Sequence, residues 1–152
     1  MAQINTRTKV EISIDEDTFH VVISDLDVSQ KEEMNKRAEE LEAVTANIRL
    51  VSSMMDDIET NKQLIACVGV VEKAKLLWEN KEIKRNITEL QKKVSDANPD
   101  KMYSDSLMRR LDLTISGEDK PNLMAAIKSK MINPEVVIME IGKQIEEAKQ
   151  KK

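Results

Sequence analysis

The chain has 152 residues, of which 34 % are charged and only 2 % are aromatic, and its formal net charge is −4. Globular enzymes usually build their cores and substrate pockets with more aromatic surface than this. The composition is typical of long, solvated helices and argues against a catalytic domain. The modest charge of mixed sign favours solubility and indicates no particular class of partner.

The sequence also carries expectations about location. The first residues lack the apolar segment of a secretory signal, and no run approaches 18 apolar residues. Cys67 is the only cysteine, which excludes an intrachain disulfide. It lies in the apolar run 64–68, where we expect it to be a buried small hydrophobic residue. We therefore expect a cytoplasmic protein without a membrane segment.

The chain opens with two runs of alternating apolar residues. Val10, Ile12 and Ile14 alternate with polar residues, and the same alternation resumes at Phe19 and continues to Ile23. Such alternation predicts half-buried strands, and the four polar residues 15–18 between the runs predict a β-hairpin. An isolated hairpin is marginal in water, so a third strand or a helix must cover it.

A long amphipathic helix is predicted next. Ser29 and Glu32 have the spacing of a capping box, so the helix is expected to begin there. Its apolar residues then recur at alternating steps of three and four, as in a heptad repeat. We interpret this seam as the partner-binding surface. The predicted seam consists of Leu41, Val44, Ile48, Val51, Met55 and Ile58.

A second stripe runs from Leu76 to Val94, through Ile83, Ile87 and Leu90. The polar residues 59–62 predict a turn between the two stripes, and a second helix is expected from about 63 to 97, because Pro99 disfavours helical geometry at Asn98. The alternative is one continuous helix of nearly seventy residues, roughly 100 Å long. We prefer the hairpin because it buries both stripes within one chain.

The composition changes after Pro99. Leu111, Leu113 and Ile115 alternate with polar residues and predict a third strand at 111–115. A short helix is expected to open at Pro121. Asn133 and Pro134 predict the start of the last helix, with asparagine as N-cap and proline as first helical residue.

These elements predict an α+β fold that is predominantly helical. A small antiparallel sheet combines the N-terminal hairpin with the strand near 111–115, a long helical hairpin is inserted as a coiled-coil stalk, and two C-terminal helices cover the sheet. We expect one domain, 1–152, with an α/β head formed by 9–27 and 100–152 and a stalk formed by 29–98.

The sequence contains little that points to catalysis or to a cofactor. His20 is the only histidine and has no cysteine or histidine at ligand spacing, so we interpret it as a surface residue. The acidic run Asp15–Asp17 lacks the glycine and the bidentate glutamate of a calcium loop. Three glycines are too few for a phosphate-binding loop. We therefore predict no catalytic, metal or cofactor site and no small-molecule substrate.

Basic residues supply the alternative function. A basic ribbon along the second helix and before the third strand could contact nucleic acid, although glutamates interleave with it and no aromatic pair is available for base stacking. The ribbon consists of Lys81, Lys84, Arg85, Lys92, Lys93, Arg109 and Arg110.

We therefore expect a non-enzymatic adaptor or structural protein that binds a protein partner, or copies of itself, through the helical hairpin. A short β-hairpin leading into a charged helical stalk is typical of many small oligomeric and bacteriophage or mobile-element proteins, an analogy of architecture alone. A nucleic-acid-associated regulator that uses the basic ribbon is the second hypothesis.

Overall fold

The computed structural model describes residues 7–151 and shows an α+β fold that is predominantly helical. The chain divides into two compact units. One unit, the head, comprises the chain up to Ala38 and from Tyr103 onward, and the other, the hairpin, comprises Glu39–Met102.

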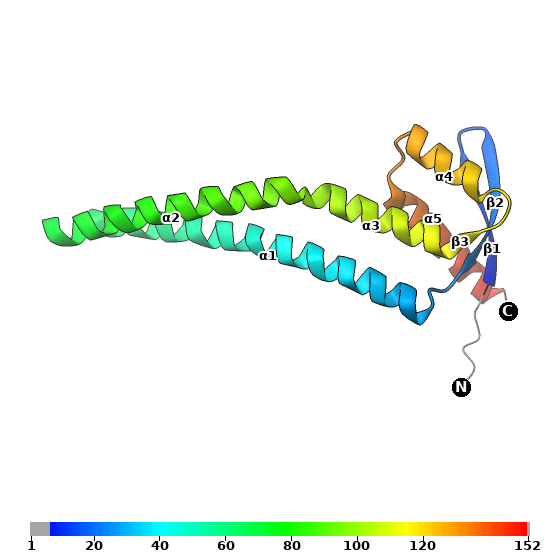
Figure 1. Cartoon of the computed structure of the whole chain (residues 1–152), viewed down its shortest axis with the longest axis horizontal. Helices are drawn as coiled ribbons and strands as arrows, with labels where there is room; N and C mark the ends of the chain where they lie inside the picture. The colour runs from blue at the N-terminus through cyan, green and yellow to red at the C-terminus, as the bar shows by residue number, and fades with distance from the viewer. Residues whose placement is uncertain (1–6, 152) are drawn as a thin grey trace. The chain divides into compact units, whose positions relative to one another are not determined.

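The head contains a three-stranded antiparallel sheet of order β1-β2-β3 (Figure 1). β1 spans Arg7–Ile14 and β2 spans Asp17–Ser24, with Val10 opposite Val21 and Ile12 opposite Phe19. The turn between them is tighter than predicted, because Asp17 and Thr18 already belong to β2. Asp15 accommodates the turn with a positive φ of 54°, a conformation that aspartate tolerates better than most residues.

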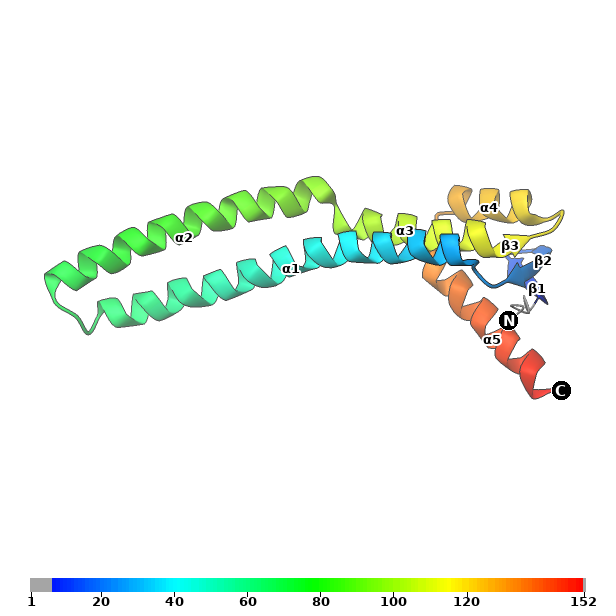
Figure 2. The same ribbon diagram turned by 60° about the horizontal axis from the view of Figure 1, so that its bottom comes forward.

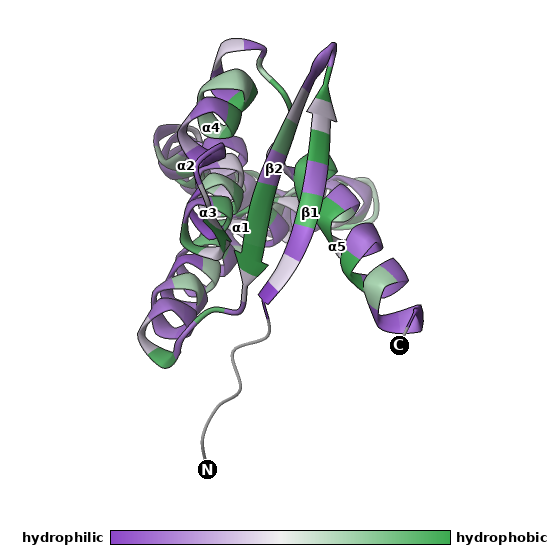
Figure 3. Ribbon diagram, turned by 90° about the vertical axis from the view of Figure 1, so that its right-hand side faces the viewer, coloured by the Kyte–Doolittle hydropathy of each residue, from purple (hydrophilic) through white to green (hydrophobic). Residues whose placement is uncertain are grey.

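Two helices cover the apolar face of this sheet. α4 spans Lys120–Ser129 and packs against β2, whereas α5 spans Pro134–Gln150 and packs against β1. Figure 3 shows the alternation of hydrophobic and hydrophilic residues along β1 that this packing requires. The buried core of the head consists of Val10, Ile12, Ile14, Phe19, Val21, Ile23, Leu111, Ile115, Leu123, Ile127, Val137 and Ile141.

The predicted strand at 111–115 is wrong over most of its length. Residues 99–114 form the helix α3, Pro99–Thr114, and β3 comprises only Ile115–Ser116. The Thr114 hydroxyl donates to the Arg110 carbonyl at 2.8 Å, as it does inside a helix. Leu111 and Ile115 are both buried. Their four-residue spacing suits a helical face, whereas their alternation with Leu113 had suggested a strand.

The long helix α1 spans Val28–Ile65 and begins two residues earlier than the predicted capping box at Ser29 and Glu32 implies. Asp27 is the capping residue, because its carboxylate accepts from the Gln30 amide at 2.7 Å. The Gln30 side chain in turn accepts from the Asp27 amide at 3.0 Å. The reciprocal pair satisfies two backbone donors that a helix start leaves free.

The turn of the hairpin also differs from the prediction. α1 continues through residues 59–62, and the connection lies at 66–69, before α2 at Val70–Ala97 (Figure 2). The single continuous helix is therefore excluded. Cys67 lies in this connection and is exposed, contrary to the burial expected from its apolar run. α2 ends at Ala97, as Pro99 predicted, and Asn98 caps it in a left-handed conformation.

The head core supports a first prediction. Leu123 is fully buried between α4 and the sheet. Leu123→Ala should lower the free energy of unfolding by about 2–5 kcal/mol, because it removes buried methyl groups and leaves a cavity. Met139→Ala, at a side chain that is 68 % exposed, is the matched control and should change stability by less than about 0.5 kcal/mol. Urea unfolding of both variants measures the difference, and equal losses would contradict the assignment of this core.

An ion pair joins the start of α1 to α3 within the head. Arg109 Nε donates to Glu33 at 3.0 Å, and its Nη1 donates to Asp112 at 3.1 Å. The hydrogen bond from Arg109, with the charges of Arg109 and Arg37, holds the pKa of the Glu33 carboxyl below its ordinary value of 4.5 despite partial desolvation. The folded state therefore favours the ionised carboxylate more than the unfolded chain does.

This shift predicts a contribution to acid sensitivity. The stabilisation from Glu33 should be complete above its unfolded pKa near 4.5 and should disappear as the pH falls through the lower folded pKa. Glu33→Gln should remove this contribution. The variant should therefore be less stable than the parent near neutral pH, and the difference in free energy of unfolding should shrink as the pH falls. Urea midpoints between pH 3 and 7 check the prediction. A difference that is constant over this range would contradict it.

Candidate interaction surfaces of the helical hairpin

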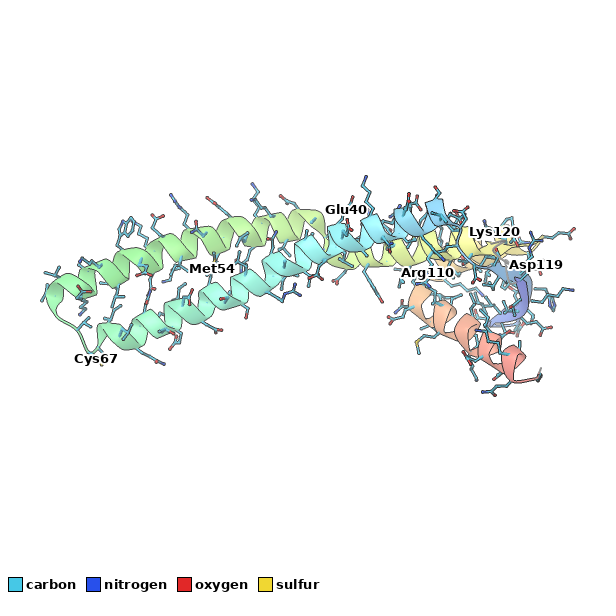
Figure 4. All side chains as sticks on the ribbon, turned by 90° about the horizontal axis from the view of Figure 1, so that it is seen from below. Glu40, Met54, Cys67, Arg110, Asp119 and Lys120 are labelled. Atoms are coloured by element: carbon cyan, nitrogen blue, oxygen red, sulfur yellow. The ribbon has the colours of Figure 1, made fainter. Side chains whose placement is uncertain are left out.

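The two helices of the hairpin meet along a single seam. Val51, Ile58 and Ile87 are buried there, and Met54, Ile83 and Leu90 pack against them. Met54, labelled in Figure 4, lies between the two helices. Heptad spacing extends the seam in both directions. Its positions on α1 are Val44, Asn47, Val51, Met54, Ile58 and Asn61, and on α2 they are Leu76, Asn80, Ile83, Ile87, Leu90 and Val94.

The predicted partner-binding seam on α1 is divided by this arrangement. Val44, Val51 and Ile58 occupy positions of the intrachain seam. Leu41 is half-buried outside that seam, and Ile48 and Met55 are exposed. The two rows share Val44, Val51 and Ile58, but the seam uses Asn47 and Met54 where the predicted row has Ile48 and Met55, because a polar residue such as Asn47 was not expected at a core position.

A hydrogen bond between two buried asparagines closes the seam near the turn. Asn61 and Asn80 are only 9 % and 6 % exposed. Asn61 Nδ2 donates to Asn80 Oδ1 at 2.9 Å, and Asn80 Nδ2 donates to the Ile58 carbonyl at 3.4 Å. A polar pair inside an apolar seam restricts the helices to the register in which both side chains meet. The sequence offered a signal for Asn80, because it fills the gap between Leu76 and Ile83 at steps of four and three.

The closed end of the hairpin exposes apolar side chains, which we call the tip patch. Trp78 is the only tryptophan of the chain and is 66 % exposed, and Val70 is 85 % exposed. Seven-residue spacing places Val71 and Trp78 on the side of α2 that faces away from α1. Figure 4 shows Cys67 at this same end. The tip patch consists of Leu64, Val68, Val70, Val71, Leu77 and Trp78.

The tip patch was not predicted from the sequence. Leu64 and Val68 belong to the apolar run 64–68 that includes Cys67, and the other four residues fall outside the two predicted stripes. The sequence nevertheless contained a signal for this patch. Val71 and Trp78 fall outside the row of Leu76 and Ile83, so the seam formed by that row does not bury them. An exposed tryptophan among exposed valines is typical of a protein-binding surface.

The residues of the predicted basic ribbon belong to both units of the chain. Lys81, Lys84, Arg85, Lys92 and Lys93 are exposed along α2, and Arg85 pairs with Glu82 at 2.9 Å. Arg109 and Arg110 lie within the helix α3, in the head. The Arg109 guanidinium contacts Glu33 and Asp112, so two carboxylates already compensate its charge.

In the described part of the head, exposed polar groups pair across its strands and turns. His20 is exposed and its Nδ1 lies 3.4 Å from Glu11 on the neighbouring strand. Within residues 7–151, no three histidine, cysteine, aspartate or glutamate side chains are grouped to hold a metal ion. No helix in the same range is long and apolar enough to cross a membrane. Lys130 forms an ion pair with Asp15 of the β-turn at 2.6 Å. The hydrogen bond from Lys130 to Asp15 raises the pKa of Lys130 above its ordinary 10.5.

Comparison of the chain with protein-family models, with curated proteins and with solved structures gives no match. The surfaces of the hairpin are therefore the features from which a function can be inferred.

The asparagine pair supports a prediction about the seam. Asn80→Leu removes one partner and leaves the Asn61 amide buried without its acceptor, so it should lower the free energy of unfolding by about 1–3 kcal/mol. The double variant Asn61→Leu/Asn80→Leu should recover most of this loss, because both polar groups are gone. Thermal and urea unfolding of the two single variants and the double variant form the mutant cycle. Additive losses would contradict a coupled pair.

Proposed function

We propose that the protein is a non-enzymatic adaptor that binds a protein partner through the closed end of its helical hairpin, and that it acts in the cytoplasm. The observation that carries this proposal is the exposure of Trp78 and its apolar neighbours at the tip. Burying a tryptophan and several valines in a partner would remove a large apolar surface from water.

The location of the tip patch supports this interpretation. Apolar side chains at the end of a two-helix hairpin have no intrachain surface on which to pack, so their exposure persists in the free protein. Trp78 combines a large rigid contact area with few rotatable bonds, which makes tryptophan a frequent centre of binding energy. Lys75 and Glu79 border it and would form part of a polar rim.

Nucleic-acid binding remains the second candidate. Trp78, Arg85 and Lys92 recur at seven-residue intervals and so share the outward side of α2, which places one base-stacking group beside two cations. Glu82 and Glu89 lie on the same helix and weaken the positive field. A protein partner accounts better for the exposed valines, which offer nothing to a phosphate backbone.

Site-specific photocrosslinking tests the proposal. A benzophenone amino acid replaces Val71 in the tip patch, leaving Trp78 in place, and the variant is irradiated inside the cells that express the chain. We expect one discrete protein adduct. Its yield should fall at least tenfold in the Trp78→Ala background, because the loss of such a centre costs about 2 kcal/mol or more.

The matched control carries the same photoreactive group at Met139, which is as exposed as Trp78 but lies on α5 of the head. Adducts of equal yield from positions 71 and 139, or none from position 71, would contradict a partner site at the tip. An adduct that nuclease removes would instead favour the second candidate. Neutralising Lys84, Arg85, Lys92 and Lys93 should then abolish it and reduce its salt dependence.

A further inference from the structure

An uncharged strip runs along one side of α1 next to the intrachain seam. Its residues follow steps of four and three, the spacing of a second helix-contact row. The Thr45 hydroxyl donates to the Leu41 carbonyl at 3.0 Å, so it can be covered without losing its partner. The charged residues of 39–65 all lie outside this strip. The strip consists of Leu41, Thr45, Ile48, Ser52 and Met55.

The hairpin has a thin core that leaves this strip uncovered. In residues 39–102, all within the described part of the chain, the buried apolar side chains are Val51, Ile58 and Ile87. Each helix thus buries one row only, whereas the helices of a four-helix bundle each bury a wider face. Ile48 and Met55 are 44 % and 48 % exposed and would complete such a face on α1.

The corresponding side of α2 carries basic residues. Ile48 and Met55 each follow a seam residue of α1, and Leu77 and Lys84 each follow a seam residue of α2. In an antiparallel helix pair, these positions lie on the same side. This side of the hairpin, which we call the flat side, therefore combines the uncharged strip of α1 with Leu77, Lys81 and Lys84 of α2.

The two helices of the hairpin carry opposite charge. Residues 39–65 of α1 contain six acidic and two basic residues, whereas α2 contains five acidic and seven basic ones. Packing α1 of one copy on α1 of another would set acidic residues against each other. Packing α1 on the α2 of a second copy sets opposite charges side by side around the bundle.

We propose that the flat side is the self-association surface of this protein and that its occupant is the flat side of a second copy. The two copies are related by a twofold axis along the hairpin, so both closed ends lie at the same end and each α1 packs on the partner α2. The Asn61–Asn80 pair sets the height of the two helices. Asp56 and Glu59 of one copy then lie near Lys84 and Lys81 of the other.

This arrangement builds on the proposed function. Leu77 of the tip patch becomes part of the interface between the copies, but the outward side of α2 with Val71 and Trp78 stays free. The dimer therefore presents two Trp78 side chains at one end and binds a partner at two points. Lysine side chains suit the interface, because their methylene stems cover apolar surface while their ammonium groups reach the acidic border. The pairing is isologous, which gives a closed dimer.

Sedimentation equilibrium of the full chain tests the surface. We expect the parent to be a dimer, and Ile48→Asp should weaken its self-association at least tenfold, because it places a charge in the centre of the strip. Leu50→Asp is the matched control. Leu50 is 45 % exposed, close to the 44 % of Ile48, but it lies on the opposite side of α1. Circular dichroism checks that both variants keep their helices.

A charge exchange tests the pairing of α1 with the partner α2. Asp56→Lys/Glu59→Lys and Lys81→Glu/Lys84→Glu should each weaken the homodimer, because both create like charges across the interface. An equimolar mixture should form heterodimers, in which each altered surface meets its complement. Native mass spectrometry distinguishes the three species. A mixture that stays as poorly associated as its components would overturn this pairing.

The orientation is measured with the natural Cys67, which is exposed at the closed end. A spin label at this thiol should report a distance below about 30 Å if the closed ends lie together. Opposed copies that meet near Ile48 would separate the labels by roughly 50–60 Å at 1.5 Å per helical residue. The longer distance would overturn the arrangement.

The outcomes separate this inference from the proposed function. A parent chain that stays monomeric at hundreds of micromolar, or equal weakening by Ile48→Asp and Leu50→Asp, would overturn the self-association surface. Photocrosslinking at position 71 in the Ile48→Asp variant reports partner binding without the dimer. Its yield there tests the tip patch, whatever the oligomeric state proves to be.

Discussion

The register of the helical hairpin depends on one hydrogen bond between the buried side-chain amides of Asn61 and Asn80. An apolar seam of Val, Ile, Leu and Met tolerates a slip by one heptad, because neighbouring layers have similar shapes. Asn61 and Asn80 remove that freedom, since any other register leaves two amides buried without partners. The position of every residue on the outer surface, including the tip patch and the strip of α1, follows from this constraint.

The polarity of Asn61 also explains where prediction from the sequence succeeded and where it failed. Period-two alternation located β1 and β2, and proline with its preceding asparagine located the end of α2 and the start of α5. The polar residues 59–62, which include Asn61, predict a turn, because a polar group in an apolar stripe usually marks an interruption. Only the second asparagine, nineteen residues later, makes it a core residue, and a local pattern contains no information about that partner.

The surfaces were harder to predict than the fold for a related reason. A change of one residue in the seam decides which side of an amphipathic helix is exposed. With Asn47 in the seam, the Ile48 side chain is left on the surface. Leu111 and Ile115 present the same problem in the head. Their four-residue spacing fits one face of a helix, but with Leu113 between them it also fits the alternation of a strand. Tertiary contacts decide such cases, and local propensity does not.

The order of elements along the chain has a consequence for the route by which the protein folds. Ile115 of β3 pairs with Ile23 of β2, 92 residues earlier. The entropy of closing so long a loop must be lost before the contact stabilises anything. The helical hairpin lies inside that loop and forms from nearer neighbours, which favours rapid formation. Once the helical hairpin has formed, the loop between β2 and β3 is effectively shorter. We therefore expect α1 and α2 to assemble before β3 joins the sheet, so that formation of the head is the slow step of folding.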